Sequence, residues 1–296
     1  GRGREHYQWN VDSWGSTGIE ADVELLAVLC SFLGRVGLAP AEVGIRVSSR
    51  KVLQEVLDSV GVAGEQFAAV CIVVDKLGKL PPDEAAAQLG KLGLDNTAVA
   101  TIQRVLGLRD LDTLAAALGD DSGAVAELRS LWALAEGYGL TEWLEFDGSI
   151  VRGLAYYTGP VVEAHDRHGE LRAVCGGGRY DRLLSSFGGK DLPATGFGFG
   201  DMVILELLKD RGRLPQLAGS VQDVVFALNP ELRPAAMDVA GRLRVQGRSV
   251  DLVLDEKRLK WALKHADRCG AERLLLLAPK EWEGGLVKVR DLASGA

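Results

Sequence analysis

The chain has 296 residues, of which 47% are hydrophobic and 25% are charged. This composition excludes a mostly disordered chain, and the formal charge of −7 excludes a global basic field that would attract nucleic acid. The longest apolar runs, such as residues 274–278, are too short to span a bilayer, so no membrane segment is predicted. Four widely spaced cysteines with no CxxC pair fit a reducing compartment better than a disulfide framework or a zinc site.

The first residues, GRGREHYQWNVD at 1–12, form a polar stretch. In an extended chain, Arg4, His6 and Gln8 share one face, which could present charge and an amide to an anionic ligand. A polar edge strand explains the same pattern, and spacing alone favours that simpler interpretation.

A helix is predicted over residues 20–36 and a strand over 43–47. Residues 51–145 change character, because alanine-rich helical patterns recur there and are separated by glycines. The segment is therefore predicted to be a helical insertion. Its expected helices cover residues 51–60, 83–92, 95–107, 110–118 and 122–138.

Strand patterning returns in residues 146–181, where the sequence DRHG predicts the turn of a hairpin. Arg152 lies in an apolar strand context, where an unpaired guanidinium is costly, so it must meet a carboxylate, a phosphate or solvent. An ion pair with Glu163 across the sheet fits the pattern as well as a bound anion does. Tyr156 would share the face of Arg152, and Tyr157 would point away unless a glycine bends the strand.

Two glycine-rich segments follow. In CGGGRYD at 175–181, three glycines after a strand would let the backbone approach a ligand closely, although such triplets also make ordinary turns. Arg179 and Asp181 would then begin a helix, where backbone donors favour anions. The run GFGFG at 196–200 is not a dinucleotide fingerprint, and its alternation favours an element packed tightly under a ligand.

The histidines indicate no metal site. His165 and His168 are expected at a hairpin tip, where a solvated turn explains them better than metal binding. His265 shares a predicted helix with Lys264 and Arg268, and we expect this face to be solvated.

Residues 219–296 alternate between strands and helices with short connections, which predicts an α/β domain with parallel strands. This segment holds 13 Lys and Arg against 11 Asp and Glu, so it leans weakly basic. Its cations could form a phosphate-facing stripe or only solvated helix faces. They are Arg242, Arg244, Arg248, Arg258, Lys260 and Lys264.

Taken in order, these segments resemble the histidyl-tRNA synthetases, a family of class II aminoacyl-tRNA synthetases. GRGREHYQWN looks like the tail of the second class motif, VRGLAYYTG like the histidine-specific motif, CGGGRYD like the glycine loop, and PATGFGFGD like the third class motif. The wording is most similar to the bacterial and organellar branch. The resemblance implies an α+β fold whose antiparallel catalytic sheet is interrupted by a helical insertion and followed by a C-terminal α/β anticodon-binding domain. The expected boundaries are 1–50 and 146–213 for the catalytic core, 51–145 for the insertion and 219–296 for the anticodon-binding domain.

The resemblance also implies roles for residues around the amino acid. Arg152 matches the catalytic arginine between the substrate carboxylate and the ATP α-phosphate. Tyr156 and Tyr157 match the pair that closes the histidine pocket, and Gln8 and Asp12 match positions that hold the polar groups of histidine. The glycines expected to line the pocket are Gly176, Gly177 and Gly178.

For ATP, Arg2 and Arg4 match loop residues near the phosphates and the tRNA end. His6 stands where the family has a phenylalanine on one face of adenine, and Val203 stands where it has an arginine on the other face. Of the basic residues in the last domain, Arg242, Arg244 and Lys260 are expected to bind tRNA.

The implied activity is that of a histidine–tRNA ligase, which activates L-histidine with ATP and Mg²⁺ and transfers it to tRNA(His). The complete protein is expected to be a soluble homodimer in the cytosol, chloroplast or mitochondrion. The chain begins without Met, which predicts that its natural N-terminus is missing. The first class motif and the leading arginine of the second motif are absent from it, so the resemblance implies that this chain alone is not fully active. A catalytically silent relative that senses histidine or tRNA is the alternative.

Overall fold

The computed structural model describes residues 4–62, 65–74, 81–119, 121–150, 156–169, 171–215 and 221–292. The chain divides into two compact units, Gly1–Leu214 and Pro215–Ala296. Within the described ranges, every helix is too short or too polar to cross a bilayer.

The larger unit is built on a six-stranded sheet with the order β1-β6-β5-β4-β2-β3. All neighbouring strands are antiparallel except β2 and β3, which pair in parallel. This arrangement confirms the predicted antiparallel core. The strands are β1 (Gln8–Trp14), β2 (Val43–Ser49), β3 (Leu144–Phe146), β4 (Pro160–Asp166), β5 (Cys175–Arg179) and β6 (Ala194–Gly200).

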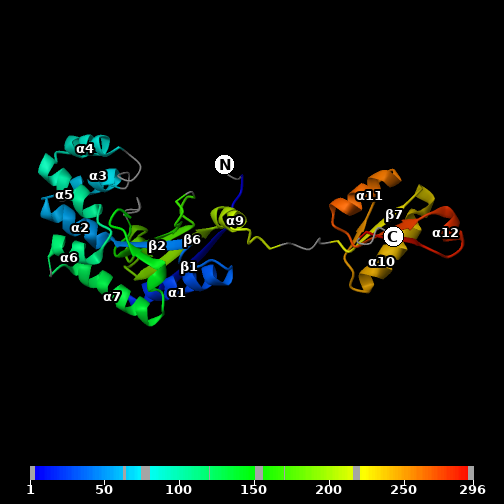
Figure 1. Ribbon diagram of the computed structural model, residues 1–296, viewed down its shortest axis with the longest axis horizontal. Helices are drawn as coiled ribbons and strands as arrows, with labels where there is room; N and C mark the ends of the chain where they lie inside the picture. Colours follow the sequence, from blue (N-terminus) through cyan, green and yellow to red (C-terminus); the bar gives the residue numbers. More distant parts are fainter. Residues whose placement is uncertain are drawn as a thin grey trace. The chain divides into compact units, whose positions relative to one another are not determined.

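Helix α1 (Glu20–Arg35) packs against one face of this sheet (Figure 1). The contact is aromatic: the ring centroids of Trp9 and Phe32 are 5.4 Å apart, and those of Phe32 and Phe199 are 5.1 Å apart. Phe197 meets Trp9 edge-on at 5.6 Å. Because successive strand residues point to opposite faces, the residues between these aromatics on β1 and β6 face away from α1. They are polar side chains and glycines.

Between β2 and β3 the chain forms a group of helices beside the sheet (Figure 1). Side-chain oxygens of Asp95, Asp110 and Ser122 cap three of these helices, accepting hydrogen bonds of 2.8, 2.8 and 3.1 Å from main-chain N–H groups three residues on. The predicted helices are confirmed, and α3 is an additional one. The group comprises α2 (Arg50–Ser59), α3 (Glu65–Val74), α4 (Pro82–Lys91), α5 (Asn96–Leu106), α6 (Leu111–Leu118) and α7 (Gly123–Gly137), followed by the 3₁₀ turn η1 (Thr141–Trp143).

The predicted hairpin exists as β4 and β5, but one histidine lies elsewhere than expected. His165 is buried within β4, with its Nε2 2.9 Å from Oε1 of Glu145, so the expectation of a solvated turn is wrong for this residue. His168 does lie in the turn. The helix expected near Tyr180 is only the single turn α8 (Leu183–Ser186), and the longer α9 (Asp201–Asp210) follows β6.

The smaller unit is a four-stranded sheet with the order β10-β9-β7-β8, in which only β10 is antiparallel to its neighbour. Helices α10 and α11 cover opposite faces of it: Val225 packs with alanines of α10, and Phe226 packs with alanines of α11. The predicted α/β domain is therefore confirmed. Its elements are β7 (Asp223–Ala227), η2 (Pro230–Leu232), α10 (Arg233–Val245), β8 (Val250–Leu252), α11 (Leu259–Arg268), β9 (Arg273–Leu277), α12 (Pro279–Glu283) and β10 (Lys288–Asp291).

A buried carboxylate joins the strands of this unit. The side chain of Asp223 is fully buried and pairs with Arg248 and with Nε of Arg273, the latter at 2.7 Å. Burial opposes ionisation, but the two guanidinium groups outweigh it and hold the pKa of Asp223 below its ordinary value. Arg248 is thereby engaged in an internal ion pair rather than free to bind phosphate.

Candidate functional site

An open cavity of about 400 Å³ lies on the face of the larger sheet that points away from α1. Strands β1, β6 and β5 form its floor and one wall, and the segment before β4 and the turn after β5 form the rest. The lining residues are Gln8, Asn10, Asp12, Tyr156, Tyr157, Gly176, Gly177, Tyr180, Leu183, Gly196, Phe197 and Gly198.

Strand β1 supplies the polar wall of this cavity. Gln8, Asn10 and Asp12 alternate along the strand, so their side chains leave the same face. Nε2 of Gln8 donates a 2.7 Å hydrogen bond to Oδ1 of Asn10. The hydroxyl of Tyr180 donates to Oδ1 of Asp12. Amide and carboxylate groups are therefore held in a fixed row along one side.

Burial raises the pKa of Tyr180, and the neighbouring carboxylate of Asp12 raises it further. The phenol is consequently a neutral donor at any physiological pH. Asp12 keeps one oxygen free to accept a hydrogen bond from a ligand.

The glycines of β6 make room for these side chains. Gly196 pairs with Asp12 and Gly198 pairs with Asn10 across the strands. A Cβ at Gly196 would overlap Oδ1 of Asp12 and lie 2.7 Å from its Cγ, and one at Gly198 would lie 2.7 Å from Nε2 of Gln8. The alternating sequence therefore places bulky aromatics toward α1 and leaves the cavity floor bare. The tight packing expected of this run is observed, and its place under a ligand stays a prediction.

Three tyrosines form another part of the wall. The ring centroids of Tyr156 and Tyr157 lie 4.8 Å apart, and Tyr156 meets Tyr180 edge-on at 6.0 Å. Both members of the predicted pair line the same cavity, so the regular strand alternation that would have turned Tyr157 away does not hold here. Tyr156 lies in a turn ahead of β4, where strand alternation does not apply.

The triple glycine lies inside strand β5 rather than in a loop after a strand. Arg179 ends this strand instead of beginning a helix, and its buried guanidinium donates to Asp22 through Nε at 3.0 Å. It also donates to the carbonyl oxygens of Ser16 at 3.0 Å and Gly18 at 2.7 Å. The expectation of an anion-favouring helix start at Arg179 is therefore wrong, because Arg179 ends a strand. Its guanidinium nitrogens are engaged internally.

The residues expected to contact ATP are not brought into this cavity by the described part of the chain. Arg2 and Arg152 lie outside the described residues. Arg4 and His6 precede β1, are exposed, and are not among the residues that line the cavity. Val203 lies on α9 and packs against the hydrophobic core.

Several residues that line the cavity were not predicted from the sequence. Tyr180 and Asn10 carry polar groups that face the cavity, and Leu183 contributes an apolar wall, whereas the ring of Phe197 packs toward α1. The alternation of polar residues after Gln8 was a signal for Asn10. Nothing local identified Tyr180, because its partner Asp12 is 168 residues away.

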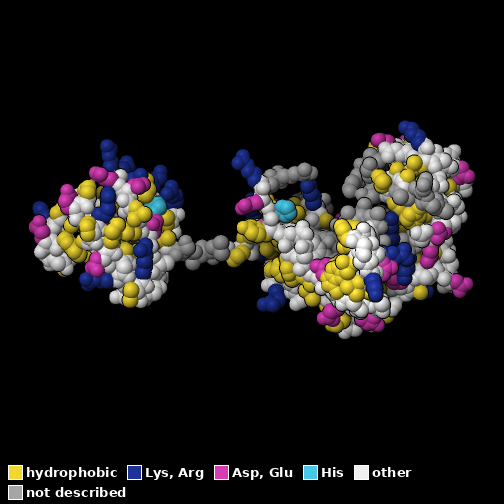
Figure 2. Space-filling view, turned by 180° about the vertical axis from the view of Figure 1, so that it is seen from behind, with side chains coloured by type: hydrophobic (Ala, Val, Ile, Leu, Met, Phe, Trp, Pro, Cys, Tyr) yellow, Lys and Arg dark blue, Asp and Glu magenta, His cyan; other side chains and the backbone are white. Residues whose placement is uncertain are grey.

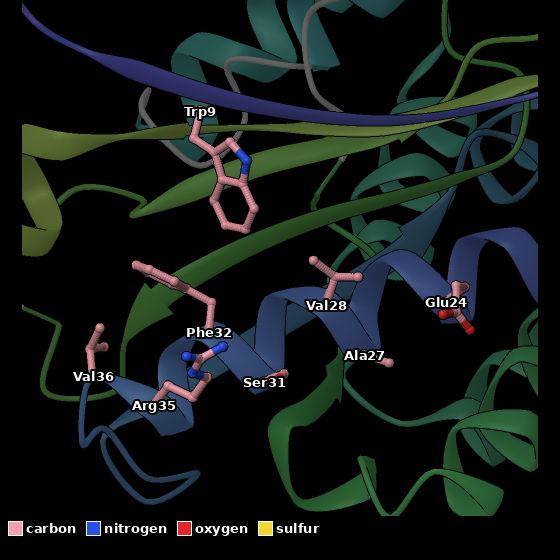
Figure 3. Close-up of a pocket in the computed structure, with 8 residues that line it drawn as sticks. All are labelled: Trp9, Glu24, Ala27, Val28, Ser31, Phe32, Arg35 and Val36. Atoms are coloured by element: carbon pink, nitrogen blue, oxygen red, sulfur yellow. The ribbon is translucent and has the colours of Figure 1, made fainter.

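A second hollow, of about 710 Å³, lies between β1 and α1 (Figure 3). Trp9 projects from the strand toward Phe32 and Val28 of the helix, and Glu24 and Arg35 lie toward its two ends. Its walls are mainly apolar, and no glycine lines it. The polar and hydroxyl groups that define a small-molecule site are concentrated in the other cavity.

The cations expected to bind tRNA lie on both faces of the smaller unit. Arg242 and Arg244 belong to α10, and Lys260 belongs to α11 on the opposite face. Arg242 pairs with Asp238 at 2.8 Å, and Arg244 donates to the carbonyl of Val250 at 3.1 Å. Figure 2 shows Lys and Arg side chains at several separate places on the visible face of this unit. These residues therefore do not form a single stripe.

Among its described lining residues, the cavity of about 400 Å³ contains one carboxylate, that of Asp12. Among the described residues, the group of three metal-ligating side chains lies in the smaller unit instead. A divalent ion at the cavity would thus have few protein ligands, which fits an ion held chiefly by substrate phosphates.

Comparison with known proteins identifies the family of each part of the chain. The histidyl-tRNA synthetase family matches residues 1–201, and the anticodon-binding domain family matches residues 222–296. The chain is 50% identical over 295 residues to the chloroplastic/mitochondrial histidine–tRNA ligase of Arabidopsis thaliana, and it spans 61% of that protein. It is 38% identical to the histidine–tRNA ligase of Opitutus terrae and spans 69% of its length.

Solved structures agree. The crystal structure of histidyl-tRNA synthetase from Nostoc sp. PCC 7120 superposes with a TM-score of 0.71 at 25% identity, over 98% of this chain and 70% of that one. An ATP phosphoribosyltransferase regulatory subunit/histidyl-tRNA synthetase from Bacillus halodurans shares the fold, with a TM-score of 0.66 at 23% identity.

The sheet, its helical insertion and the separate α/β unit are those of a class II aminoacyl-tRNA synthetase with an anticodon-binding domain. Within that class, the chain belongs to the histidyl-tRNA synthetase family.

Proposed function

We propose that the protein is a histidine–tRNA ligase, which joins L-histidine to tRNA(His) through a histidyl-adenylate. The observation that carries this proposal is the pairing of Asp12 with Tyr180 over a glycine floor, in a chain of this family. Because the chain spans 61% of the plant relative, the proposal concerns the complete protein.

The cavity suits a neutral imidazole. Such a ring carries one N–H donor and one bare nitrogen acceptor. The free oxygen of Asp12 accepts from the N–H group, and a tyrosine hydroxyl donates to the other nitrogen. A site that bonds both nitrogens discriminates strongly against side chains that lack them. Gln8 and the main chain of the glycine floor are placed to bind the amino end of the ligand.

The proposed chemistry is attack of the histidine carboxylate on the α-phosphorus of ATP, with pyrophosphate as the leaving group. Two anions must meet, so fixed positive charge and positioning dominate the barrier. The family resemblance assigns the bridging role to Arg152, with Arg2, Arg4 and His6 toward the nucleotide. A planar, permanently charged guanidinium suits paired oxygens of this kind. Mg²⁺ would neutralise the phosphates when bound, with few ligands from the protein.

We expect histidine binding to depend on Asp12 by about 10- to 100-fold, because Asp12→Ala removes a hydrogen bond to a charged acceptor. Isothermal titration calorimetry with histidine measures this. Ser13→Ala is the matched control: Ser13 neighbours Asp12 on β1 but faces the other side of the sheet, so its loss should leave the affinity unchanged. Equal affinity of Asp12→Ala and the parent chain would contradict the proposed pocket.

Histidinol separates the two ends of the ligand, because it lacks the carboxylate. Arg152→Ala should weaken histidine binding and leave histidinol binding unchanged if Arg152 holds the carboxylate. The sensor alternative shares the histidine pocket but not the chemistry. Histidine-dependent exchange of pyrophosphate into ATP by the complete protein therefore distinguishes ligase from sensor, and its absence would favour the sensor.

The smaller unit is proposed to bind tRNA(His). Lys260 and Lys264 are exposed on α11 and have no carboxylate partner among the described residues, unlike Arg242 on α10. We expect Lys260→Glu with Lys264→Glu to lower tRNA affinity and reduce the slope of log K against log salt by about 1 to 2, as for one or two lost phosphate contacts. Arg242→Glu with Arg244→Glu should have a smaller effect in the same filter-binding titration. A larger loss of tRNA affinity in the α10 variant than in the α11 variant would indicate that tRNA binds to α10.

Two further parts of the proposal rest on resemblance. The organellar location is supported by 50% identity to the chloroplastic/mitochondrial plant enzyme. The homodimeric state of the complete protein follows from the family, and sedimentation equilibrium measures it.

A further inference from the structure

Three potential metal ligands meet on the smaller unit, and none of them is assigned a role in the proposed function. Oδ2 of Asp251 lies 2.7 Å from Nε2 of His265, and Sγ of Cys269 lies 3.6 Å from the same nitrogen. All three donor atoms lie within 4.8 Å of one another. The residues come from two elements, since Asp251 is on β8 and the other two are at the end of α11.

The fold explains why these donors meet. His265 and Cys269 are four residues apart, so they lie on the same side of α11. Ala262 and Ala266 bury the adjacent side of the helix against the sheet, which brings the histidine over edge strand β8. Trp261 stacks on the imidazole with ring centroids 4.6 Å apart and planes 11° apart. The ring is therefore fixed between an indole and a carboxylate, and the solvated helix face expected from the sequence is wrong here.

We propose that Asp251, His265 and Cys269 form a binding site for a borderline-soft divalent transition metal of the Zn²⁺ type. Zinc bonds of about 2.0–2.1 Å to nitrogen and 2.3 Å to sulfur place the two ligand atoms about 3.5 Å apart in a tetrahedron. The observed separation of Sγ from Nε2 is 3.6 Å, but Sγ also lies 3.9 Å from Nδ1, so the thiol is beside the ring and must turn toward the Nε2 side when a metal binds. The carboxylate needs to move outward by about 0.6 Å to reach the corresponding nitrogen–oxygen separation.

The chemical types of the three ligands favour one class of metal ion. Their number leaves one coordination position open. A thiolate and an imidazole favour zinc-like ions over Mg²⁺ or Ca²⁺, which prefer oxygen ligands. Two anionic ligands also balance the charge of a divalent ion. Three protein ligands leave a fourth tetrahedral position for water.

One neighbouring group opposes binding. Nη2 of Arg268 lies 3.0 Å from Nδ1 of His265. A neutral imidazole bound to metal through Nε2 carries its proton on Nδ1, which then cannot accept from a guanidinium. Arg268 is exposed and can move aside, but its displacement lowers the affinity. In Arg268→Gln the amide oxygen can accept the Nδ1 proton, and we expect metal affinity to rise by about tenfold, the scale of a second-shell partner.

The test uses the full chain, freed of metal by a chelator and then titrated with Co²⁺ as a spectroscopic probe. The expected result is one equivalent bound, with intense visible bands of tetrahedral cobalt, a near-ultraviolet sulfur-to-cobalt band, and displacement by Zn²⁺. Cys269→Ser should remove the sulfur band, and His265→Gln should weaken binding by about 100-fold or more. His168→Gln is the control, since His168 is an exposed histidine 3.3 Å from Asp166 and should not affect the spectrum.

Weak octahedral bands without a sulfur band in the parent chain would overturn the proposal, whatever the variants do. So would a sulfur band that persists in Cys269→Ser, or a spectrum lost in His168→Gln. Far-ultraviolet circular dichroism of each metal-free variant checks that the fold is retained. A tighter complex in Arg268→Gln supports the site independently of any ligand removal.

Discussion

Gly177→Ala is expected to destabilise the larger unit by about 3 kcal/mol or more, the upper range for overpacking a core. A Cβ at this position would overlap the carbonyl oxygen of Gly196 and lie 2.6 Å from Cα of Phe197. Both atoms belong to the main chain of β6, which pairs with β5 at this point. Backbone held in a central strand cannot move aside without breaking that pairing. Urea unfolding followed by circular dichroism measures the loss.

Gly198→Ala is the matched control, because the obstacle there is a side chain. Its Cβ would lie 2.7 Å from Nε2 of Gln8, the free end of a flexible amide. We expect its unfolding free energy to change by less than about 1 kcal/mol, while histidine affinity falls because Gln8 is displaced. Equal stability losses in Gly177→Ala and Gly198→Ala would contradict the expectation that a main-chain obstacle costs more stability than a flexible side chain.

These two glycines also show what local sequence can reveal about the site. The glycine-rich runs at 175–181 and 196–200 predicted that the backbone approaches another group closely, but they did not identify that group. Glycine is disfavoured in strands, so the triplet suggested a loop. It is tolerated in β5 because main-chain atoms of β6 occupy the space beside Gly177, and Pro160 and Tyr157 occupy the space beside Gly178. These contacts are remote in sequence from at least one of the two glycines. The close approach of Gly196 to Asp12 at the cavity is a relation that only the folded sheet creates.

The helices were more predictable because their signals are local. Asp95 and Asp110 cap the helices that follow them, and both starts were indicated by the sequence. Helix α3 was missed because Ile72, Val73 and Val74 are β-branched residues with low helix propensity, and tertiary packing overrides that preference. The roles of Tyr180 and His265 were missed for the opposite reason, since each depends on a carboxylate from another strand.

Arg179→Met is expected to cost the larger unit about 3–5 kcal/mol, the penalty for breaking a buried ion pair. The side chains of Arg179 and Asp22 are 6% and 5% exposed, so the abandoned carboxylate cannot reach water. Burial already raises the pKa of Asp22 above its ordinary value, with the hydrogen bond and charge of Arg179 acting against that rise. The loss of the guanidinium removes this opposition and raises the pKa of Asp22 further.

The raised pKa of Asp22 makes the stability of Arg179→Met depend on pH. In the variant, folded Asp22 holds a proton at pH values where the unfolded chain, with an Asp pKa of about 3.9, has released it. Stability therefore falls as pH rises from about 4 through the raised folded pKa, and the deficit relative to the parent chain should be smaller at pH 5 than at pH 7. Urea unfolding at both pH values measures this difference.

Asp22→Asn in the Arg179→Met background tests whether the buried charge is the cause. The double variant should recover roughly half of the lost free energy, because it removes the unpaired carboxylate. Full recovery is not expected, since Arg179 also satisfies the carbonyl oxygens of Ser16 and Gly18. A single variant that loses less than about 1 kcal/mol, or a deficit independent of pH, would show that this pair does not hold the first turn of α1 against β5. In that case packing, and not this ion pair, would hold β5 in position.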